Sequence, residues 1–513
     1  MTRWICFVAL FLHPLLAWSA PQLVTSGDYT AYIDDAPAWV KPVPGPVTEQ
    51  AGTGEGASIE LLDVQVSLQA RAYSLFKRII LRVTNQAEVE ETAQIPVSYI
   101  PSFQKLTVHG LWITRDGKRS SRLEPSAIRL VANEADMDQR VYRGIVTAVV
   151  FVKDLQPGDL VELSYSTSGS NPVLGEHHSV GVPLALSVPV KLMHARVVAP
   201  TDRRLQMKLF NSTAQPVVHT EGGVTDTTLL VRNVAKLEPE PQTPPEHWNM
   251  PLAQFSDFRS WQEVGEWAQT LFAPKAVVPS QLQARIKEWQ AHSGLEAARL
   301  ALDYVQKEIR YVSVSLGENA MRPASPADVV RRGFGDCKDK SLLLVTLLQA
   351  MNIEASPALV STTWEGSVFD MLPSAEAFDH VIVAAQIDGR KYWLDGTSEF
   401  QSGPLGARYA GDYGKALVVA AKGSSVEPVA APPEYATGYS TKHRFVITKF
   451  SAPVDFGVRA TYSGAAANIM RGVGAGGSQQ DRERRHRSLQ AYIPWRRVGR
   501  RGQGPQRRQN RAV

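Results

Sequence analysis

The distribution of hydrophobic residues predicts a long β-rich region in the first half of the chain. Between about residues 28 and 235, hydrophobic residues alternate with polar ones or gather in short valine-rich runs, and helical periodicity is nearly absent. A period of two is typical of strands that bury one face. Asp116-Gly117 and Pro157-Gly158-Asp159 are turn sequences between such runs. We therefore predict a β-sandwich-like domain over residues 25–237, with strands that include residues 59–68, 79–84, 106–114, 146–152 and 160–165.

A proline-rich linker at residues 238–250 ends this region. Prolines lack the amide hydrogen that strand pairing needs, and they stiffen the chain. After about Ser256, hydrophobic residues recur at steps of three and four positions, which predicts α-helices. The residues that carry this pattern are Trp261, Val264, Trp267, Ala268 and Leu271, followed by Leu300, Val305 and Ile309. A second domain, of mixed helices and strands, is therefore expected after the linker.

A further helix is predicted to begin at Cys337 and to run to about Met351. Asp336 is suited to cap its N-terminus, and Asp339 stands where a second carboxylate completes a capping box. Leucine and valine cover more than one face between residues 342 and 348, so this helix should be buried at the centre of its domain. The free amides and the dipole at a helix N-terminus favour an anion, so the thiolate form of Cys337 should be stabilised.

A histidine and an aspartate follow on a predicted hairpin. Asp388-Gly389 is a two-residue turn sequence, which places residue 387 opposite residue 390. In this register His380 and Asp395 are diagonal neighbours on one face, about 7–8 Å apart at the backbone. A four-residue loop would keep the two side chains on one face, whereas a three-residue loop would separate them. The register of this hairpin therefore decides whether Asp395 can orient His380.

Together the three residues predict a nucleophile, its base and an orienting acid. Each also has an ordinary interpretation: a cysteine that opens a helix is often structural, a histidine in an apolar strand is often a core residue, and Asp-Gly-Thr is often a turn. The order of the three residues in the sequence fits a catalytic set. The shared face of His380 and Asp395 and the predicted helix start at Cys337 fit it as well, which favours Cys337, His380 and Asp395 as that set. The backbone amide of Cys337 is one candidate oxyanion donor, and residues 311–319 are the expected source of another.

The cysteine content fits an exported protein. The chain has 513 residues and two cysteines, and Cys6 lies in an N-terminal run that resembles a signal peptide, predicted at residues 1–20. Removal of that run leaves Cys337 as a single thiol, which cannot form an internal disulfide. His13 and Pro14 interrupt the run, and no later segment is apolar enough to span a membrane. We expect a periplasmic or secreted protein with no stable membrane span after cleavage.

The basic charge of the chain comes from its C-terminus. The formal charge is +5, but residues 482–513 contain eleven Arg and one Glu, so the preceding residues carry a net charge of −5. This Arg-rich tail has neither strand nor helix periodicity, and we interpret it as a disordered arm or as the product of a shifted reading frame. Nucleic-acid binding fits poorly with export and with the few aromatic residues of the tail. The scattered histidines at 109, 177, 178 and 194 lack metal-ligand spacing.

These motifs resemble those of one family. The string Gly335-Asp336-Cys337-Lys338-Asp339-Lys340-Ser341, with Asp379-His380 and Trp393-Leu394-Asp395-Gly396-Thr397, is similar to bacterial exported members of the transglutaminase-like family. This family belongs to a papain-related superfamily with a Cys-His-Asp triad. In these members a β-rich domain of unknown function precedes the transglutaminase-like core. Residues 36–40 and 155–159 also resemble that first domain.

The resemblance implies an α+β protein with a defined order of domains. A β-sandwich-like domain, a transglutaminase-like domain at residues 251–435 and a partial C-terminal β-region at residues 436–481 would follow one another. It also implies that Cys337, His380 and Asp395 act as nucleophile, base and orienting acid. Members of the family continue into a C-terminal β-region, and the Arg-rich tail departs from that pattern.

The expected function is acyl transfer through a thioester, with water or an amine as the acceptor. Water would give a peptidase or amidase, and a lysine amine would give cross-linking. No phosphate loop, calcium loop or dinucleotide motif is present, so no cofactor is expected. The expected partner is a protein or peptide substrate in the cell envelope, with no nucleic acid, and the oligomeric state is left open. The alternative is a catalytically silent envelope binding or scaffold protein that keeps a transglutaminase-like domain.

Overall fold

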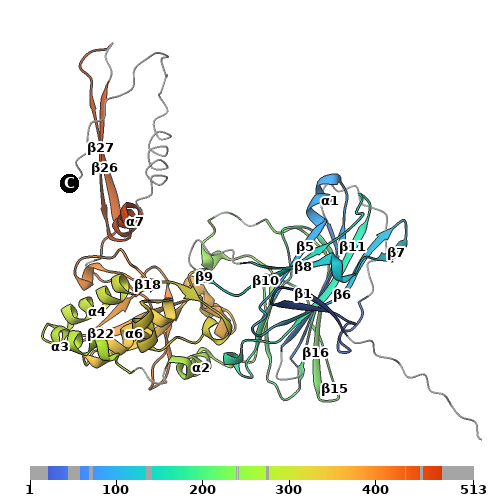
Figure 1. Ribbon diagram of the computed structural model, residues 1–513, viewed down its shortest axis with the longest axis horizontal. Helices are drawn as coiled ribbons and strands as arrows, with labels where there is room; N and C mark the ends of the chain where they lie inside the picture. The colour runs from blue at the N-terminus through green and yellow to red at the C-terminus, as the bar shows by residue number, and fades with distance from the viewer. Residues whose placement is uncertain are drawn as a thin grey trace, which may run out of the picture. The chain divides into compact units, whose positions relative to one another are not determined.

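The computed structural model describes an α+β protein in two compact units (Figure 1). It describes residues 21–43, 58–68, 73–133, 141–238, 240, 242–272, 277–433, 435–450 and 454–475. One unit comprises the chain up to Thr397 together with Ala410–Ala431, and the other comprises Ser398–Tyr409 and the chain from Pro432. The predicted signal peptide at residues 1–20 and the Arg-rich tail at residues 482–513 lie outside the described residues. Among those residues, no helix has the length and apolar character needed to cross a membrane.

One large sheet organises the N-terminal part of the first unit. Its ten strands follow the order β1-β2-β6-β11-β4-β3-β13-β16-β15, with β7 paired to β6. The turn Asp116-Gly117 joins β6 to β7 with Arg115 opposite Lys118, as the sequence predicts. The strands are β1 (Gln22–Ser26), β2 (Tyr29–Ile33), β3 (Ser58–Ser67), β4 (Ser74–Arg82), β6 (Lys105–Arg115), β7 (Lys118–Ser121), β11 (Leu160–Ser168), β13 (Val190–Pro200), β15 (Val217–Glu221) and β16 (Val224–Val234).

Two three-stranded sheets pack on this sheet. The first has the order β5-β10-β8 and the second β12-β17-β14. Each small sheet packs on its own hydrophobic core, and Ile79 and Leu81 of β4 contact both cores. Because residues two apart in a strand point to the same face, both small sheets cover the same face of the large sheet. The sandwich-like prediction for this part is therefore confirmed. The strands are β5 (Gln94–Tyr99), β8 (Ile128–Ala132), β10 (Val146–Phe151), β12 (Ser179–Pro183), β14 (Gln206–Phe210) and β17 (Leu252–Ser256).

The opposite face of the large sheet carries buried ion pairs. Arg196 of β13 contacts Asp226 of β16 and donates from Nη1 to the carbonyl of Trp39 at 2.8 Å. His194 Nδ1 lies 2.7 Å from Asp63 Oδ1, which accounts for one of the scattered histidines as part of this network. Buried charges that are paired and hydrogen-bonded avoid the cost of an isolated charge.

Two features of this part differ from the sequence prediction. A short helix, α1 (Gln86–Thr92), interrupts the strands and is capped by the side chain of Asn85. Strand β17 follows the proline-rich linker but pairs with β12 and β14, so the β-rich structure, predicted at 25–237, also includes residues 252–256 beyond the linker predicted at 238–250. The prolines indicate where the linker lies. They do not indicate which strands β17 pairs with, because those strands lie far from it in the sequence.

The part of the first unit that follows the linker contains helices around a five-stranded sheet. Its five antiparallel strands have the order β23-β22-β21-β24-β25, and α6 packs against β21 and β22. The helices are α2 (Trp261–Phe272), α3 (Gln283–Trp289), α4 (Gly294–Glu308), α5 (Pro326–Arg332) and α6 (Cys337–Ala350). The strands of the sheet are β21 (Glu354–Val360), β22 (His380–Ile387), β23 (Arg390–Leu394), β24 (Lys415–Val418) and β25 (Ser425–Pro428).

The hairpin that carries the predicted base has the predicted register. Ile387 pairs with Arg390 and Val383 with Leu394, so the loop contains two residues. Asp388 and Gly389 both have positive φ, 50° and 77°, as the commonest two-residue hairpin turn requires. The two-residue loop predicted from Asp388-Gly389 is therefore confirmed.

The second unit contains a hairpin and a helix. Strands β26 (Gly438–Val446) and β27 (Asp455–Ser463) pair in antiparallel fashion, and α7 (Gly464–Ala475) follows. Segment 398–409, predicted as part of the transglutaminase-like domain, lies in this unit, where Arg471 donates to the carbonyl of Phe400 at 3.1 Å. Among its described residues, the predicted β-region at 436–481 thus has two strands. It also has the helix α7, which was not predicted from the sequence.

We expect Gly389→Ala to destabilise the first unit by about 1–2 kcal/mol, because an L-residue side chain disfavours this left-handed backbone. No atom lies within 4 Å of the added methyl position, so backbone strain is the only local cost. Urea unfolding followed by tryptophan fluorescence measures the change. Asp388→Gly at the neighbouring position is the matched control and should shift the unfolding free energy by less than about 0.5 kcal/mol. Equal effects of the two variants would contradict this account of the turn.

Candidate active site

Cys337 is the first residue of α6, and a complete capping box holds this end of the helix. The Asp336 carboxylate accepts from the amide of Asp339 at 3.3 Å, and the Asp339 carboxylate accepts from the amide of Asp336 at 3.4 Å. Arg332 of α5 pairs with Asp339, and Lys338 pairs with Asp336. The predicted helix start and both caps are confirmed. Because both carboxylates are fixed, the first turn of α6 presents the half-buried thiol of Cys337 in a defined position.

Helix α6 is enclosed along most of its length and is bonded directly to the strand that carries His380. All residues from 338 to 348 are buried. Ser341, one turn after Cys337, donates from Oγ to the carbonyl of Val381 at 2.9 Å. Val381 is the neighbour of His380 on β22. The predicted nucleophile and the predicted base are therefore held on elements that are packed and hydrogen-bonded together.

The structure brings His380 and Asp395 into hydrogen-bonding contact. His380 Nε2 lies 3.1 Å from Asp395 Oδ2. The other oxygen of Asp395 accepts from the amide and the hydroxyl of Thr397, each at 2.7 Å. Gln306 of α4 donates to the backbone carbonyl of Asp395 at 2.8 Å. Asp395 is thus fixed through both its side chain and its backbone.

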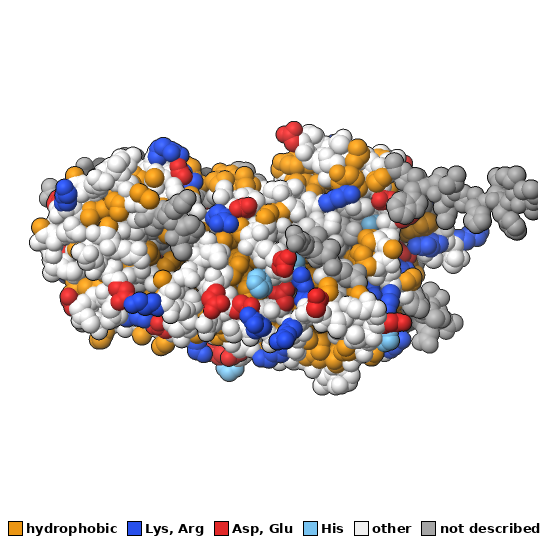
Figure 2. Space-filling view, turned by 90° about the horizontal axis from the view of Figure 1, so that it is seen from below, with side chains coloured by type: hydrophobic (Ala, Val, Ile, Leu, Met, Phe, Trp, Pro, Cys, Tyr) orange, Lys and Arg blue, Asp and Glu red, His pale blue; other side chains and the backbone are white. Residues whose placement is uncertain are grey.

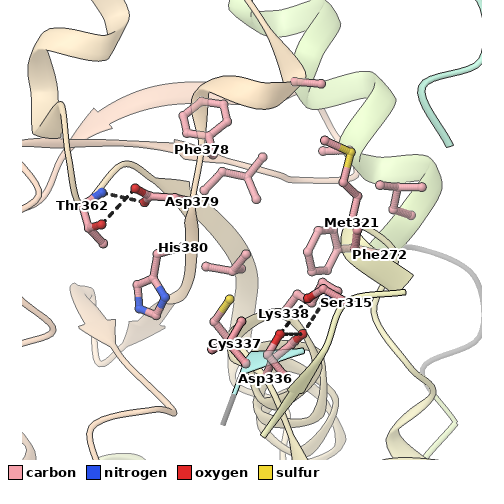
Figure 3. Close-up of a pocket in the computed structure, with 18 of the residues that line it drawn as sticks. Phe272, Ser315, Met321, Asp336, Cys337, Lys338, Thr362, Phe378, Asp379 and His380 are labelled. Carbon is pink, nitrogen blue, oxygen red and sulfur yellow. Dashed lines mark hydrogen bonds and ion pairs between the residues drawn. The ribbon is translucent and has the colours of Figure 1, made fainter. Parts of the chain in front are cut away.

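The electrostatics of this pair favour a charged imidazole. Burial of His380 opposes its protonation, but the Asp395 carboxylate, by its charge and its hydrogen bond, and then Cys337 raise the pKa of His380 well above the usual value. Burial likewise opposes ionisation of Asp395, yet His380 and the hydrogen bonds from Thr397 lower the pKa of Asp395. Because Nε2 of His380 contacts Asp395, the other ring nitrogen, Nδ1, is the one that can interact with Cys337. In Figure 3 the Cys337 side chain faces this ring.

A cleft of about 570 Å³ opens above Cys337 and His380. In Figure 3 Phe272 and Met321 lie on one side of the cysteine, and Asp379 and Thr362 lie on the other. Asp379 accepts from the amide of Thr362 at 2.7 Å, so this carboxylate is engaged by its own loop. The apolar part of the lining consists of Ile100, Val141, Trp267, Ala268, Leu271, Phe272, Ala320, Met321, Leu359, Ala375, Phe378 and Val381.

Two parts of the site were not predicted from the sequence. Tyr413 donates from its hydroxyl to Asp395 Oδ2 at 3.4 Å, and its ring centroid lies 5.7 Å from that of His380. It precedes β24 in a loop without periodicity, so no sequence signal marks it. The second missed part is the contribution of Ile100, Val141 and Arg143 from the β-rich region. Of the region expected to supply the second oxyanion donor, Tyr311, Ser313 and Ser315 line the cleft.

Family comparisons agree with this architecture. Residues 72–238 match the model of DUF3857, a domain of unknown function with a solved structure, and residues 280–394 match the model of the transglutaminase-like superfamily. The two matches follow one another along the chain in the order that the sequence motifs predicted. No curated protein matches the sequence.

One of two similar solved structures shows a related fold at low sequence identity. A candidate protease from Parabacteroides distasonis ATCC 8503 is 18% identical, with a TM-score of 0.58, over 74% of this chain and 72% of that chain. A candidate cysteine protease from Cytophaga hutchinsonii aligns over 56% of this chain and 89% of its own, but its TM-score of 0.21 at 11% identity carries no argument.

We expect Tyr413→Phe to slow alkylation of Cys337 by about fivefold, because one hydrogen bond to the buried Asp395 carboxylate is lost. Tyr413→Ala should slow it further, since removal of the ring also admits water to the His380–Asp395 pair. Iodoacetamide labelling rates over a range of pH measure the effect. A role limited to packing would leave the Tyr413→Phe profile unchanged.

The raised pKa of His380 predicts a stability that declines with rising pH. The folded protein binds this proton more tightly than the unfolded chain, so the contribution is complete below about pH 6.5 and is lost as pH rises through the folded pKa. In that window the unfolding free energy should fall by up to about 1.4 kcal/mol per pH unit. Urea unfolding of Cys337→Ser and of Cys337→Ser with His380→Asn isolates the histidine from the thiol. Parallel pH profiles for the two proteins would refute the assignment.

Proposed function

From the premise that residues 280–394 form a transglutaminase-like domain, we propose that the chain is an exported cysteine enzyme that acts on amide or peptide carbonyls through a thioester. Cys337 is the nucleophile, His380 the base and Asp395 the acid that orients it. The observation that carries the proposal is the 3.1 Å contact between His380 and Asp395 beside the thiol that opens α6. Cys337 and His380 line the cleft described above.

The first half of the reaction forms the acyl enzyme. The Cys337 thiolate attacks the carbonyl carbon, and the negative charge that develops on the carbonyl oxygen is stabilised at the N-terminus of α6, with the amide of Cys337 as one donor. The imidazolium of His380 transfers its Nδ1 proton to the amide nitrogen, the carbon–nitrogen bond breaks, and the amine leaves. The products are a thioester on Cys337 and a neutral imidazole held by Asp395.

The second half resolves the thioester. Water or an amine gives a proton to Nδ1 of His380 as it attacks the thioester carbonyl, and the carbon–sulfur bond then breaks. The thiolate and the imidazolium are restored, and an acid or a new amide is released. The raised pKa of His380 supports this cycle, because the imidazolium of the resting state has a carboxylate partner.

The proposed substrate is a protein or peptide of the cell envelope. On the face shown in Figure 2, acidic and basic side chains are interspersed rather than gathered into a field of one sign. A polyanion such as nucleic acid favours a continuous basic surface, so this face gives such a partner no support. The apolar lining of the cleft suits an uncharged amide or peptide segment with hydrophobic side chains.

Selective alkylation of Cys337 separates the enzyme from a catalytically silent binding protein. We expect iodoacetamide to label the native protein rapidly near neutral pH and His380→Ala at least tenfold more slowly, because the imidazolium partner of the thiolate is lost. Mass spectrometry locates and quantifies the label. His292→Ala is the matched control, since that exposed histidine lies outside the cleft lining. Slow labelling that is indifferent to His380 would favour the binding protein.

Incubation with envelope peptides and a primary amine distinguishes the two possible acceptors. Peptide cleavage or deamidation with a gain of oxygen from labelled water identifies hydrolysis, and a mass increase by the amine identifies acyl transfer. Both products should disappear in Cys337→Ser. Product formation that persists in Cys337→Ser would assign the activity to another group or to a contaminant.

A further inference from the structure

The cleft presents different surfaces on the two sides of Cys337. In Figure 3 the apolar side chains of Phe272 and Met321 lie on one side of the cysteine. Asp379 lies on the other side, which is also the side of His380. A substrate that extends across Cys337 therefore contacts hydrophobic groups at one end and a carboxylate at the other.

The Asp379 carboxylate is held in place by neutral donors. Its Oδ1 accepts from the amide of Thr362 at 2.7 Å, and its Oδ2 accepts from the hydroxyls of Thr362 and Thr363 at 2.9 and 3.1 Å. An ionised carboxylate has about four acceptor positions, so these hydrogen bonds leave about one open. Among the described residues, no cation pairs with Asp379, whereas Asp336 and Lys338 of the same lining pair with each other. An exposed negative charge in a fixed position therefore faces the cleft.

Arg143 also lines the cleft, but its backbone lies toward the opposite side. It directly follows β9 (Val141–Tyr142), which pairs in parallel with β19 (Ser313–Val314). Ser315 follows β19, and its amide donates to the last carbonyl of β9 at 2.8 Å. Figure 3 shows Ser315 across the cysteine from Asp379.

The charge of Asp379 extends to the catalytic base. Burial and Asp395 raise the pKa of Tyr413 most, and the charge of Asp379 raises this pKa further. The ring centroid of Tyr413 lies 5.7 Å from that of His380. A group bound beside His380 is therefore within the electrostatic influence of Asp379.

The chemistry of the proposed reaction places the amine part of the substrate on this side. The imidazolium of His380 protonates the leaving nitrogen, which must therefore lie within hydrogen-bonding reach of the ring. Asp379 directly precedes His380 in the sequence and lies on the same side of Cys337. An amine that resolves the thioester gives its proton to the same ring and takes the same place. The acyl part then extends toward Phe272.

We propose that Asp379 binds a positive charge on the amine part of the substrate and thereby selects peptides with lysine or arginine after the scissile bond. The proposal rests on the function proposed above, because it concerns what the Cys337 site accepts. The substrate class is a peptide with a large hydrophobic side chain on the acyl side and a basic side chain on the amine side. A carboxylate with an open acceptor position forms a charge-assisted hydrogen bond to an ammonium or a guanidinium.

Protection of Cys337 from iodoacetamide measures this preference without requiring turnover. Three peptides with blocked ends carry phenylalanine, then glycine, then lysine, glutamine or glutamate. In the full-length native protein the lysine peptide should give half-protection at a concentration about three- to fivefold lower than the glutamine peptide, a moderate preference because Asp379 is exposed. The glutamate peptide should protect least. An isomer with lysine before phenylalanine places the cation on the acyl side and should lose most of the advantage.

Removal of the charge at Asp379 provides the decisive comparison. Asp379→Asn keeps an oxygen that can accept from the amide of Thr362, and the preference for lysine over glutamine should fall below about twofold. Added salt should reduce the preference of the native protein and have little effect on the variant, because mobile ions screen an exposed pair.

Glu354→Gln is the matched control for this loss of charge. Glu354 is exposed at the start of β21, outside the cleft lining, so its variant should keep the native order of peptides. The protection of each protein is normalised to its own labelling rate without peptide. Circular dichroism checks that each protein is folded.

The outcomes separate this inference from the proposed function. If labelling depends on His380, then equal protection by the three peptides, no protection by any, or a lysine preference that persists in Asp379→Asn would overturn the role of Asp379 alone. Equal protection by the two isomers would overturn its place on the amine side. Labelling indifferent to His380 would overturn the proposed enzyme. A lysine preference that Asp379→Asn loses and Glu354→Gln keeps would support recognition of a basic substrate by Asp379.

Discussion

The first turn of α6 buries an unusual concentration of charge, and much of the surrounding structure serves to neutralise it. Asp336, Lys338, Asp339 and Lys340 each expose less than a tenth of their surface. Several kcal/mol are needed to remove each such charge from water unless partners replace the solvent. Lys338 neutralises Asp336, Arg332 reaches Asp339 from the end of α5, and Lys340 donates to the carbonyl of Ile309 at 2.6 Å. These partners fix α5, the end of α4 and the cap of α6 around Cys337.

The parts of the site that the sequence could predict are those whose geometry is local. The start of α6 follows from a capping box within four residues, and the position of Asp395 relative to His380 follows from a two-residue turn. The parts that it could not predict depend on distant segments. Tyr413 reaches Asp395 from a loop without periodicity, and Arg143 reaches the cleft because β9 pairs with a strand about 170 residues away along the chain. Hydrophobic patterning identifies buried faces but not which faces meet.

The difference between local patterns and pairing of distant segments also explains which features of the fold were not predicted. The β-rich character of the first domain was predictable from alternation, but its arrangement as one large sheet beneath two small ones was not. Strand β17 belongs to this arrangement although it follows the prolines, because its pairing partners precede the linker. Helix α1 is too short to show a period, and Asn85, its cap, is a common turn residue as well.

The hydrogen bond from Ser341 to Val381 has a dynamic consequence. It joins the helix that carries the Cys337 thiol to the strand that carries the His380 imidazole, one turn after the cysteine and one residue after the histidine. Separation of those groups therefore requires α6 and β22 to come apart, which is a cooperative opening of the domain interior and a rare event. The wall formed by β9 is attached through a two-residue strand and a few backbone contacts, so it can fluctuate at much lower free energy. The cleft is therefore held rigidly at the thiol and the imidazole and more loosely at β9.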